Sequence, residues 1–166
     1  MISDQEQGQA LCIIGIGNEY RGDDAVGLLV ARQLKEHHLA GVSVREVSGE
    51  GSELMQAWDT ADAVFLIDAV STGAACGTTF RIDARKHSIP SQFFHHSSHA
   101  FGVAESIRLA NILGRLPQQC ILYGIEGKDF DIGTTVSLDV REAVQKVVAT
   151  VLGEIHAAIP CPVPGP

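Results

Sequence analysis

The stretch GIGNEYRGDDAVG, residues 15–27, joins an apolar segment to an amphipathic one through a glycine-rich turn. Turns of this kind, between a strand and a helix, usually present backbone N–H groups and a positive helix dipole to an anion. Here the turn is acidic instead: Asp23 and Asp24 are adjacent, Glu19 precedes them, and only Arg21 opposes them. These charges would repel a phosphate and attract a cation. We therefore interpret the turn as part of a cation site.

Helix capping is the alternative explanation for the two aspartates. Asp24 is well placed to cap the helix that we expect to follow, and acidic residues near a helix N-terminus are also favoured by the macrodipole. Capping needs one such residue, however, and the turn supplies two. Capping alone therefore stays the better explanation for Asp23 but not for Asp24.

An aspartate and a histidine elsewhere in the chain complete the set of candidate ligands. Asp68 closes the otherwise apolar run AVFLIDAV, where it must be partnered or face a crevice, because burying a lone carboxylate is costly. In HHSSHAFG, His99 directly precedes an expected helix and could act as a ligand or general base, whereas we expect His95 and His96 to be solvated. Two carboxylates and one imidazole suit a borderline divalent metal such as nickel, zinc or iron.

The apolar pattern predicts the elements that would position these groups. Strands are expected at residues 11–17, 42–47, 63–70, 78–83 and 120–126, with 78–83 at an edge and able to run antiparallel. Helices are expected after Asp24, at 51–61 with Ser52 near its cap, and at 101–113. The last helix follows Ser137 and carries one apolar stripe, which comprises Val140, Val144, Val147, Val148, Val151, Leu152 and Ile155. Pro90 and several serines indicate an irregular loop before the third helix.

Alternating strands and helices indicate an α/β fold. We predict a single three-layer domain over residues 11–158, with a twisted, mostly parallel sheet of about five strands and helices on both faces. Residues 1–10 and 159–166 are expected to be loose termini, since the first segment is polar and the proline-rich second cannot continue a helix.

The carboxyl ends of the strands in such a sheet form the usual ligand site. The first strand leads to Asp24, the third ends near Asp68, and the fifth ends at Glu126. His99 lies in the loop ahead of the third helix. Acidic and imidazole side chains from distant segments are therefore expected to meet at one edge of the sheet.

Composition restricts the partners and the compartment. The net charge of −8 argues against nucleic acid or an anionic membrane surface as the main partner, because both require basic patches. No run reaches the ~18 apolar residues of a membrane span, and the N-terminus has the features of neither a signal nor a transit peptide. The four cysteines are scattered without a CxxC pair. We therefore expect a reduced, cytoplasmic protein without a four-cysteine zinc site.

Four motifs, in their order and spacing, resemble those of the hydrogenase maturation proteases: IIGIGNEYRGDDAVG, LIDAV, SSHAFG and YGIEGKDFDIGTTVSLDVREAV. The resemblance covers roughly residues 11–155. It implies a twisted α/β fold and a cytoplasmic, aspartic-type endopeptidase that removes the C-terminal extension of a nickel-loaded [NiFe] hydrogenase large-subunit precursor. It also implies that Asp24, Asp68 and His99 are the catalytic, metal-contacting residues. The nickel would arrive with the precursor, and no obligate tightly bound cofactor is expected.

The resemblance leaves several points open. Gly127 stands where many family members have proline, and no role follows for Glu126, His95 or His96. If the precursor's nickel docks on the three candidate ligands, it would position the scissile bond, and either a metal-bound water or an aspartate would supply the nucleophile. Neither a GxSxG elbow nor an HExxH helix is present, which argues against serine and zincin chemistry.

Three other functions remain open on the residues alone. The first is a metal-dependent hydrolase of another small substrate on a related fold, which a stoichiometric bound ion would indicate. The second is a non-catalytic nucleotide- or flavin-binding module, supported only by the glycine-rich turn and testable by titration with NAD or FMN. The third is a non-catalytic chaperone of immature hydrogenase, which a cleavage assay would identify.

Overall fold

The computed structural model describes residues 10–94 and 101–158, and these residues form one five-stranded sheet with the order β2-β1-β3-β5-β4. The apolar runs form the strands, as expected from their pattern. The strands are β1 (Leu11–Ile16), β2 (Val42–Val47), β3 (Ala63–Val70), β4 (Thr79–Asp83) and β5 (Gln119–Glu126).

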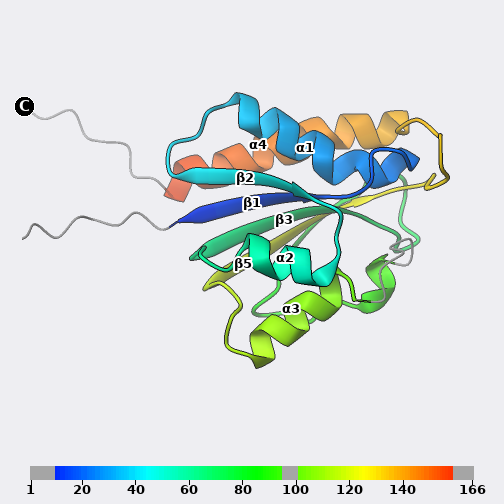
Figure 1. Cartoon of the computed structure of the whole chain (residues 1–166). Coiled ribbons are helices and arrows are strands. Elements are labelled where there is room, and N and C mark those ends of the chain that lie inside the picture. Colours follow the sequence, from blue (N-terminus) through cyan, green and yellow to red (C-terminus); the bar gives the residue numbers. More distant parts are fainter. Residues whose placement is uncertain (1–9, 95–100, 159–166) are drawn as a thin grey trace, which may run out of the picture.

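Helices cover both faces of the sheet. α1 and α4 lie on one face, and α2 and α3 lie on the other (Figure 1). The α-helices of the described residues are α1 (Val26–Glu36), α2 (Gly51–Ala57), α3 (Val103–Ile112) and α4 (Leu138–Ala158), and two 3₁₀ turns are η1 (Gly22–Ala25) and η2 (Ser91–Phe94). The predicted three-layer α/β architecture is confirmed. None of the helices described is long and apolar enough to cross a membrane.

The register of the sheet brings the ends of β1, β3 and β5 to one edge. β1 pairs in parallel with β2 and β3, and β3 pairs in parallel with β5. β4 runs antiparallel to β5 at the edge of the sheet, with Thr79 opposite Ile125. The predicted edge strand is therefore confirmed, and its direction is antiparallel. Three parallel strands deliver the chain to the same edge, which we call the carboxyl edge.

Strand β3 divides the core into two layers. All eight of its residues are buried, as expected for a central parallel strand. Phe65 and Ile67 pack with α1 and α4, whereas Val64 and Leu66 pack with α2 and α3. This alternation follows from the two-residue period of a strand. Of the stripe predicted on the last helix, Leu152 is partly buried and the others are buried in α4: Val140, Val144, Val147, Val148, Val151 and Ile155.

Helix α1 approaches the sheet closely at Gly27. A Cβ atom at this position would lie 2.2 Å from the carbonyl oxygen of Ile16 and 2.3 Å from that of Ile67. Only glycine permits this contact between helix backbone and strand backbone. The close approach places the start of α1, and η1 before it, directly over the ends of β1 and β3.

Helix α2 begins at residue 51 as predicted but ends earlier. It ends at Ala57, before the predicted limit of 51–61, and the Asp and Thr that follow favour turns over helix interiors. Its N-cap is Glu50, whose carboxylate accepts hydrogen bonds from the backbone N–H groups of Ser52 (3.1 Å) and Glu53 (3.0 Å). The cap is therefore a glutamate, and Ser52 lies inside the first turn.

The loop before the third helix contains one regular turn. η2 begins directly after Pro90, and the backbone N–H of Phe93 donates to the carbonyl of Pro90 at 3.0 Å. The expectation that Pro90 would prevent regular structure is wrong here, because its fixed φ is compatible with the first residue of a helical turn. The turn matters for function because it carries Phe93 and Phe94 to the carboxyl edge.

Candidate functional site

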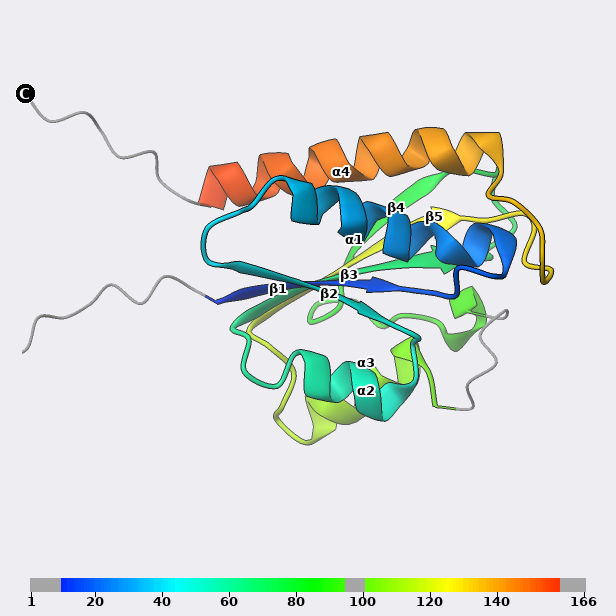
Figure 2. The same cartoon turned by 45° about the horizontal axis from the view of Figure 1, so that its top comes forward.

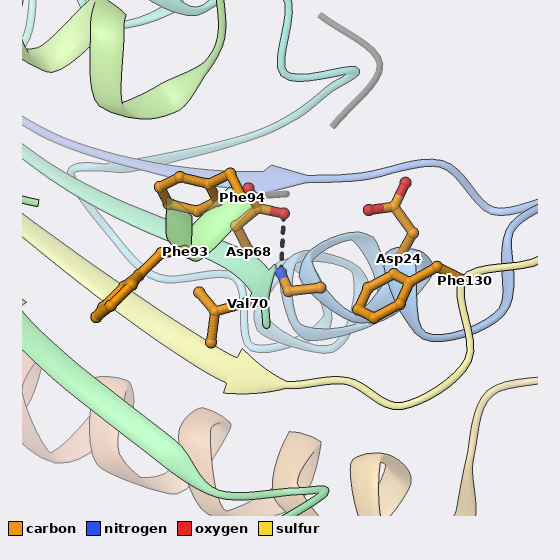
Figure 3. Close-up of a pocket in the computed structure, with 7 residues that line it drawn as sticks. Asp24, Asp68, Val70, Phe93, Phe94 and Phe130 are labelled. Atoms are coloured by element: carbon orange, nitrogen blue, oxygen red, sulfur yellow. Dashed lines mark hydrogen bonds between the residues drawn. The ribbon is translucent and has the colours of Figure 1, made fainter. Parts of the chain in front are cut away.

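A pocket lies at the carboxyl edge, between η1, the end of β3 and η2 (Figure 3). Its lining residues are Asp24, Asp68, Ala69, Val70, Phe93, Phe94 and Phe130. Two of the three predicted site residues, Asp24 and Asp68, thus share one pocket. The third, His99, lies outside the described residues together with His95 and His96. The described chain stops at Phe94 in the pocket wall and resumes at Phe101.

Asp68 is a buried carboxyl group with little hydrogen-bonding support. Its side chain belongs to β3, the residue is only 6% exposed, and its Oδ1 accepts one bond from the adjacent N–H of Ala69 at 2.8 Å (Figure 3). Burial raises the pKa of Asp68 well above its usual range, and the negative charge of Asp24 raises it further against the opposing effect of the Ala69 bond. Such a group favours either a proton or a cation.

Asp24 faces the same pocket from the turn before α1. It lies inside η1, and the N-cap of α1 is Ala25, for which no described side chain supplies a capping hydrogen bond. Asp24, although well placed in the sequence to cap the helix, does not do so, because the 3₁₀ turn moves the start of α1 beyond it. In Figure 3, Asp24 and Asp68 come from separate elements, with the ring of Phe130 beside Asp24.

The neighbouring Asp23 is fully buried and has a structural role. Its carboxylate accepts four hydrogen bonds: from the N–H groups of Lys128 (2.8 Å), Asp129 (3.0 Å) and Ser137 (2.6 Å), and from the Ser137 hydroxyl (2.8 Å). Burial would raise the pKa of Asp23, but these bonds together outweigh it and lower the pKa. The expectation that helix capping explains Asp23 is therefore wrong, because its carboxylate bonds to a remote loop. Asp23 fastens the loop between β5 and α4, residues 127–137.

Glu126, whose role was left open, fastens a second loop. It is 2% exposed, and its carboxylate accepts hydrogen bonds from the N–H of Thr72 (2.8 and 3.0 Å), the hydroxyl of Thr72 (2.8 Å) and the N–H of Gly73 (3.0 Å). These donors lie in the loop directly after β3. Glu126 therefore holds the chain that leaves Asp68 and is not among the pocket-lining residues.

Gly127 allows close packing behind the pocket. Its N–H donates to the carbonyl of Val70 at 3.0 Å, a bond that proline could not make. A Cβ atom here would lie 2.4 Å from Cζ of Phe130. Glycine at this position thus lets Phe130 pack close to the strand ends.

The aromatic wall of the pocket was missed from the sequence. Phe93 and Phe94 form an adjacent pair after Pro90, and Phe130 stands in the motif YGIEGKDF, so each had a visible signal. Among residues 10–94 and 101–158, no group of three His, Cys, Asp or Glu side chains is arranged to hold a metal. The pocket's two carboxylates supply oxygen donors that suit a divalent cation with further ligands from elsewhere. The assignment of Asp24, Asp68 and His99 as metal ligands stays a prediction.

Comparison with known proteins identifies relatives of this chain. The curated hydrogenase expression/formation protein HupD of Thiocapsa roseopersicina is 26% identical over 154 residues, covering 86% of this chain and 66% of HupD. The chain thus spans about two-thirds of the length of that relative. The [NiFe] hydrogenase maturation protease HybD from Thermococcus kodakarensis is 25% identical with a TM-score of 0.65, covering 87% of this chain and 97% of that one.

A further solved structure supports the fold, and a family model supports the membership. The hydrogenase maturating endopeptidase HybD from Escherichia coli has a TM-score of 0.73 and 20% identity, covering 89% of this chain and 93% of that one. The family model HycI, described as hydrogenase maturation protease, matches residues 28–155, a range that includes Asp68 and His99 and begins after Asp24. Because this match extends over more than half of the chain, the protein belongs to the hydrogenase maturation protease family.

Proposed function

We propose that this protein is an endopeptidase that removes the C-terminal extension of a nickel-loaded [NiFe] hydrogenase large-subunit precursor in the cytoplasm. Membership of the family supports the reaction class. One observation links the proposal to specific residues: the carboxyl groups of Asp24 and Asp68 line one pocket from two separate elements. Their arrangement supports an aspartic-type site that recognises a cation.

Electrostatics explain why such a pocket would recognise nickel. Asp68 is buried, and its neighbour Asp24 makes ionisation of Asp68 still less favourable. A divalent cation held between the two would offset both the burial cost and the mutual repulsion. The nickel is part of the substrate in this proposal, and His99 is the proposed third ligand. Docking of the nickel would then bring the adjacent C-terminal extension to the pocket.

The two carboxyl groups also suit the hydrolytic step. Peptide hydrolysis adds water to the scissile carbonyl, breaks the C–N bond and transfers a proton to the leaving amine. An ionised aspartate can accept the proton of the attacking water, and a protonated one can donate to the amine. Burial raises the pKa of Asp68, so this carboxyl group holds a proton more readily than an ordinary aspartate does. The apolar rings of Phe93, Phe94 and Phe130 would limit access of bulk water.

A processing assay tests the proposal. Purified protein is mixed with nickel-loaded precursor, and the shortened large subunit is detected by its faster migration on a gel. We expect complete conversion of the nickel-loaded precursor and none of the nickel-free precursor. His99→Ala should abolish conversion, whereas His95→Ala and His96→Ala should retain most of it. Equal cleavage of both precursor forms would contradict recognition through nickel, and no cleavage of either would contradict the proposed activity.

A further inference from the structure

Exposed apolar side chains gather in two places on the described part of the molecule. The first group adjoins the carboxyl edge and comprises Tyr20 (70% exposed), Ile132 (83%) and Leu138 (72%). The second lies at the end of α3 and comprises Leu109, Ile112 and Leu113. Exposed clusters of large apolar side chains mark interaction sites more often than single ones do. The first group differs from the second because Tyr20 and Ile132 lie on loops that also supply pocket-lining residues, and Leu138 directly follows one of these loops.

The two loops that carry Tyr20 and Ile132 are joined to each other along their length. The N–H of Gly133 donates to the carbonyl of Tyr20 at 2.8 Å, and the N–H of Asp23 donates to the carbonyl of Asp129 at 2.8 Å. Nε of Arg21 donates to the carbonyl of Phe130 at 3.2 Å. These three bonds connect the first turn, residues 17–25, with the β5–α4 loop defined above. Figure 2 shows this loop running beside the start of α1.

Side-chain contacts and close packing reinforce the junction. Four hydrogen bonds to the carboxylate of Asp23 anchor the loop, and two of them come from Ser137, the residue before Leu138. Gly22 has a φ of +53°, and a Cβ atom there would lie 2.4 Å from the carbonyl oxygen of Asp129. The two loops therefore pack as one body, on which Tyr20 and Ile132 are exposed.

Two of the exposed side chains lie on the loops that supply pocket-lining residues. Asp24 and Phe130 line the pocket, and each lies in the same loop as an exposed residue, Tyr20 in the first case and Ile132 in the second. Tyrosine is one of the usual energetic anchors of protein interfaces, and large apolar side chains beside it add buried area. Side chains on a backbone that is already fixed lose little conformational entropy on binding. A larger part of the free energy gained by burying them therefore contributes to affinity.

We propose that Tyr20, Ile132 and Leu138 form a docking surface for the folded body of the large-subunit precursor. The inference rests on the proposed function, because it names the part of the enzyme that grips that substrate outside the pocket. Apolar contact at this surface would hold the precursor while its C-terminal extension reaches Asp24 and Asp68. The surface then sets affinity for the whole precursor, and the pocket carries out the chemistry.

Two double variants test the docking surface against a matched control. Tyr20→Ser with Ile132→Ser removes two anchors at the pocket, and Ile112→Ser with Leu113→Ser removes comparable exposed apolar area at the end of α3. For the first variant we expect KM for the nickel-loaded precursor to rise by about tenfold to a hundredfold, with kcat within about twofold of wild type. The control should match wild type in both constants. Sedimentation velocity measures the oligomeric state of all three proteins.

Each result bears on a different statement. Failure of the wild type to cleave the precursor would overturn the proposed function, whereas cleavage with equal KM in both double variants would overturn the docking surface alone. A fall in kcat at unchanged KM, or conversion of a wild-type dimer to a monomer by the Tyr20 and Ile132 changes, would also overturn it. If the thermal midpoint of that variant falls, Ile132→Asp, at the more exposed position, provides the same KM measurement.

Discussion

The protein buries two kinds of carboxylate within a short distance of one edge of the sheet, and they differ in how they are hydrogen-bonded. Asp23 accepts hydrogen bonds from four donors and Glu126 from three, all in loops that are remote in sequence. Asp68 accepts one bond, from the N–H of its own neighbour, and faces another acid across a pocket. The pKa of Asp23 is lowered and that of Asp68 is raised.

This difference in hydrogen bonding indicates which carboxylates have a structural role and which are suited to bind a ligand. A carboxylate that is saturated with donors is stable as an anion and holds its surroundings in place. One that is buried without such donors is unstable as an anion and gains most from a proton or cation supplied by a ligand. Asp23 and Glu126 fix the loops on either side of the pocket, whereas Asp24 and Asp68 line the pocket and are the residues proposed to contact the substrate.

The largest expected effect is on processing by Asp24→Asn and Asp68→Asn. Asparagine keeps the volume and a carbonyl oxygen that can accept a hydrogen bond, but it removes the charge. We expect the rate of precursor cleavage to fall on the order of a hundredfold or more in each variant, since each loses one of two charges facing the pocket. Asp59→Asn, which changes an exposed carboxylate paired with Arg115, is the control and should cleave normally. Normal cleavage by both Asp24→Asn and Asp68→Asn would show that the charge of these residues is not needed for the reaction.

The second effect is on stability and concerns Asp23→Ala. Removing the carboxylate leaves four donors without their acceptor, so we expect the free energy of unfolding to fall by about 2–4 kcal/mol. The thermal midpoint should fall by roughly 5–15 °C. Asp131→Ala, in the same loop and exposed, should change the free energy of unfolding by less than about 0.5 kcal/mol. A small loss at Asp23 would mean that water replaces its contacts.

The pH dependence of this loss follows from the lowered pKa. Because the pKa of Asp23 is lower folded than unfolded, its contribution is complete above about pH 4 and is lost as pH falls through the folded pKa. Urea titrations of the wild type and of Asp23→Asn should therefore give free energies of unfolding that differ less below about pH 4 than above it. If this difference in the free energy of unfolding stayed constant down to about pH 2, the charge of Asp23 would not account for its stabilising role.

Periodicity and topology were sufficient to predict the elements and the edge that holds the site. The apolar runs and the α4 stripe predicted the layers, and parallel strands then required Asp24 and Asp68 to meet at one edge. Local sequence could not distinguish Asp23 from Asp24, because the donors to Asp23 lie 105 to 114 residues further along the chain. For the same reason the 3₁₀ turn before α1 was read as a cap: its residues suit either structure, and the β5–α4 loop packed against it favours the turn.

The pocket's aromatic residues illustrate the same limit. Phe93, Phe94 and Phe130 come from two loops whose positions depend on a turn after Pro90 and on the contacts of Gly127. Periodicity cannot place a residue that lies outside a regular element. The positions of these loops depend on contacts between residues that are remote in sequence, so sequence patterns could not predict this part of the site.

The smallest expected effect is a gain in stability from Asp68→Asn. The pKa of Asp68 is raised in the folded state, so the folded protein binds the proton more tightly than the unfolded chain does. The pH dependence is therefore opposite to that of Asp23. The contribution of Asp68 to the free energy of unfolding is complete at low pH and is lost as pH rises from about 4 towards the folded pKa. Asparagine cannot ionise and can still accept the bond from Ala69, so the variant avoids this loss.

We therefore expect the thermal midpoint of Asp68→Asn to exceed that of the wild type by a few degrees at pH 7 and to match it near pH 4. Scanning calorimetry at both values measures the difference, and Asp59→Asn, at an exposed carboxylate, should show none. An inactive variant that is more stable than the wild type would identify Asp68 as a residue whose charge destabilises the fold and serves the reaction. Lower stability of the variant at pH 7 would instead place Asp68 with Asp23 and Glu126, as a carboxylate that supports the structure.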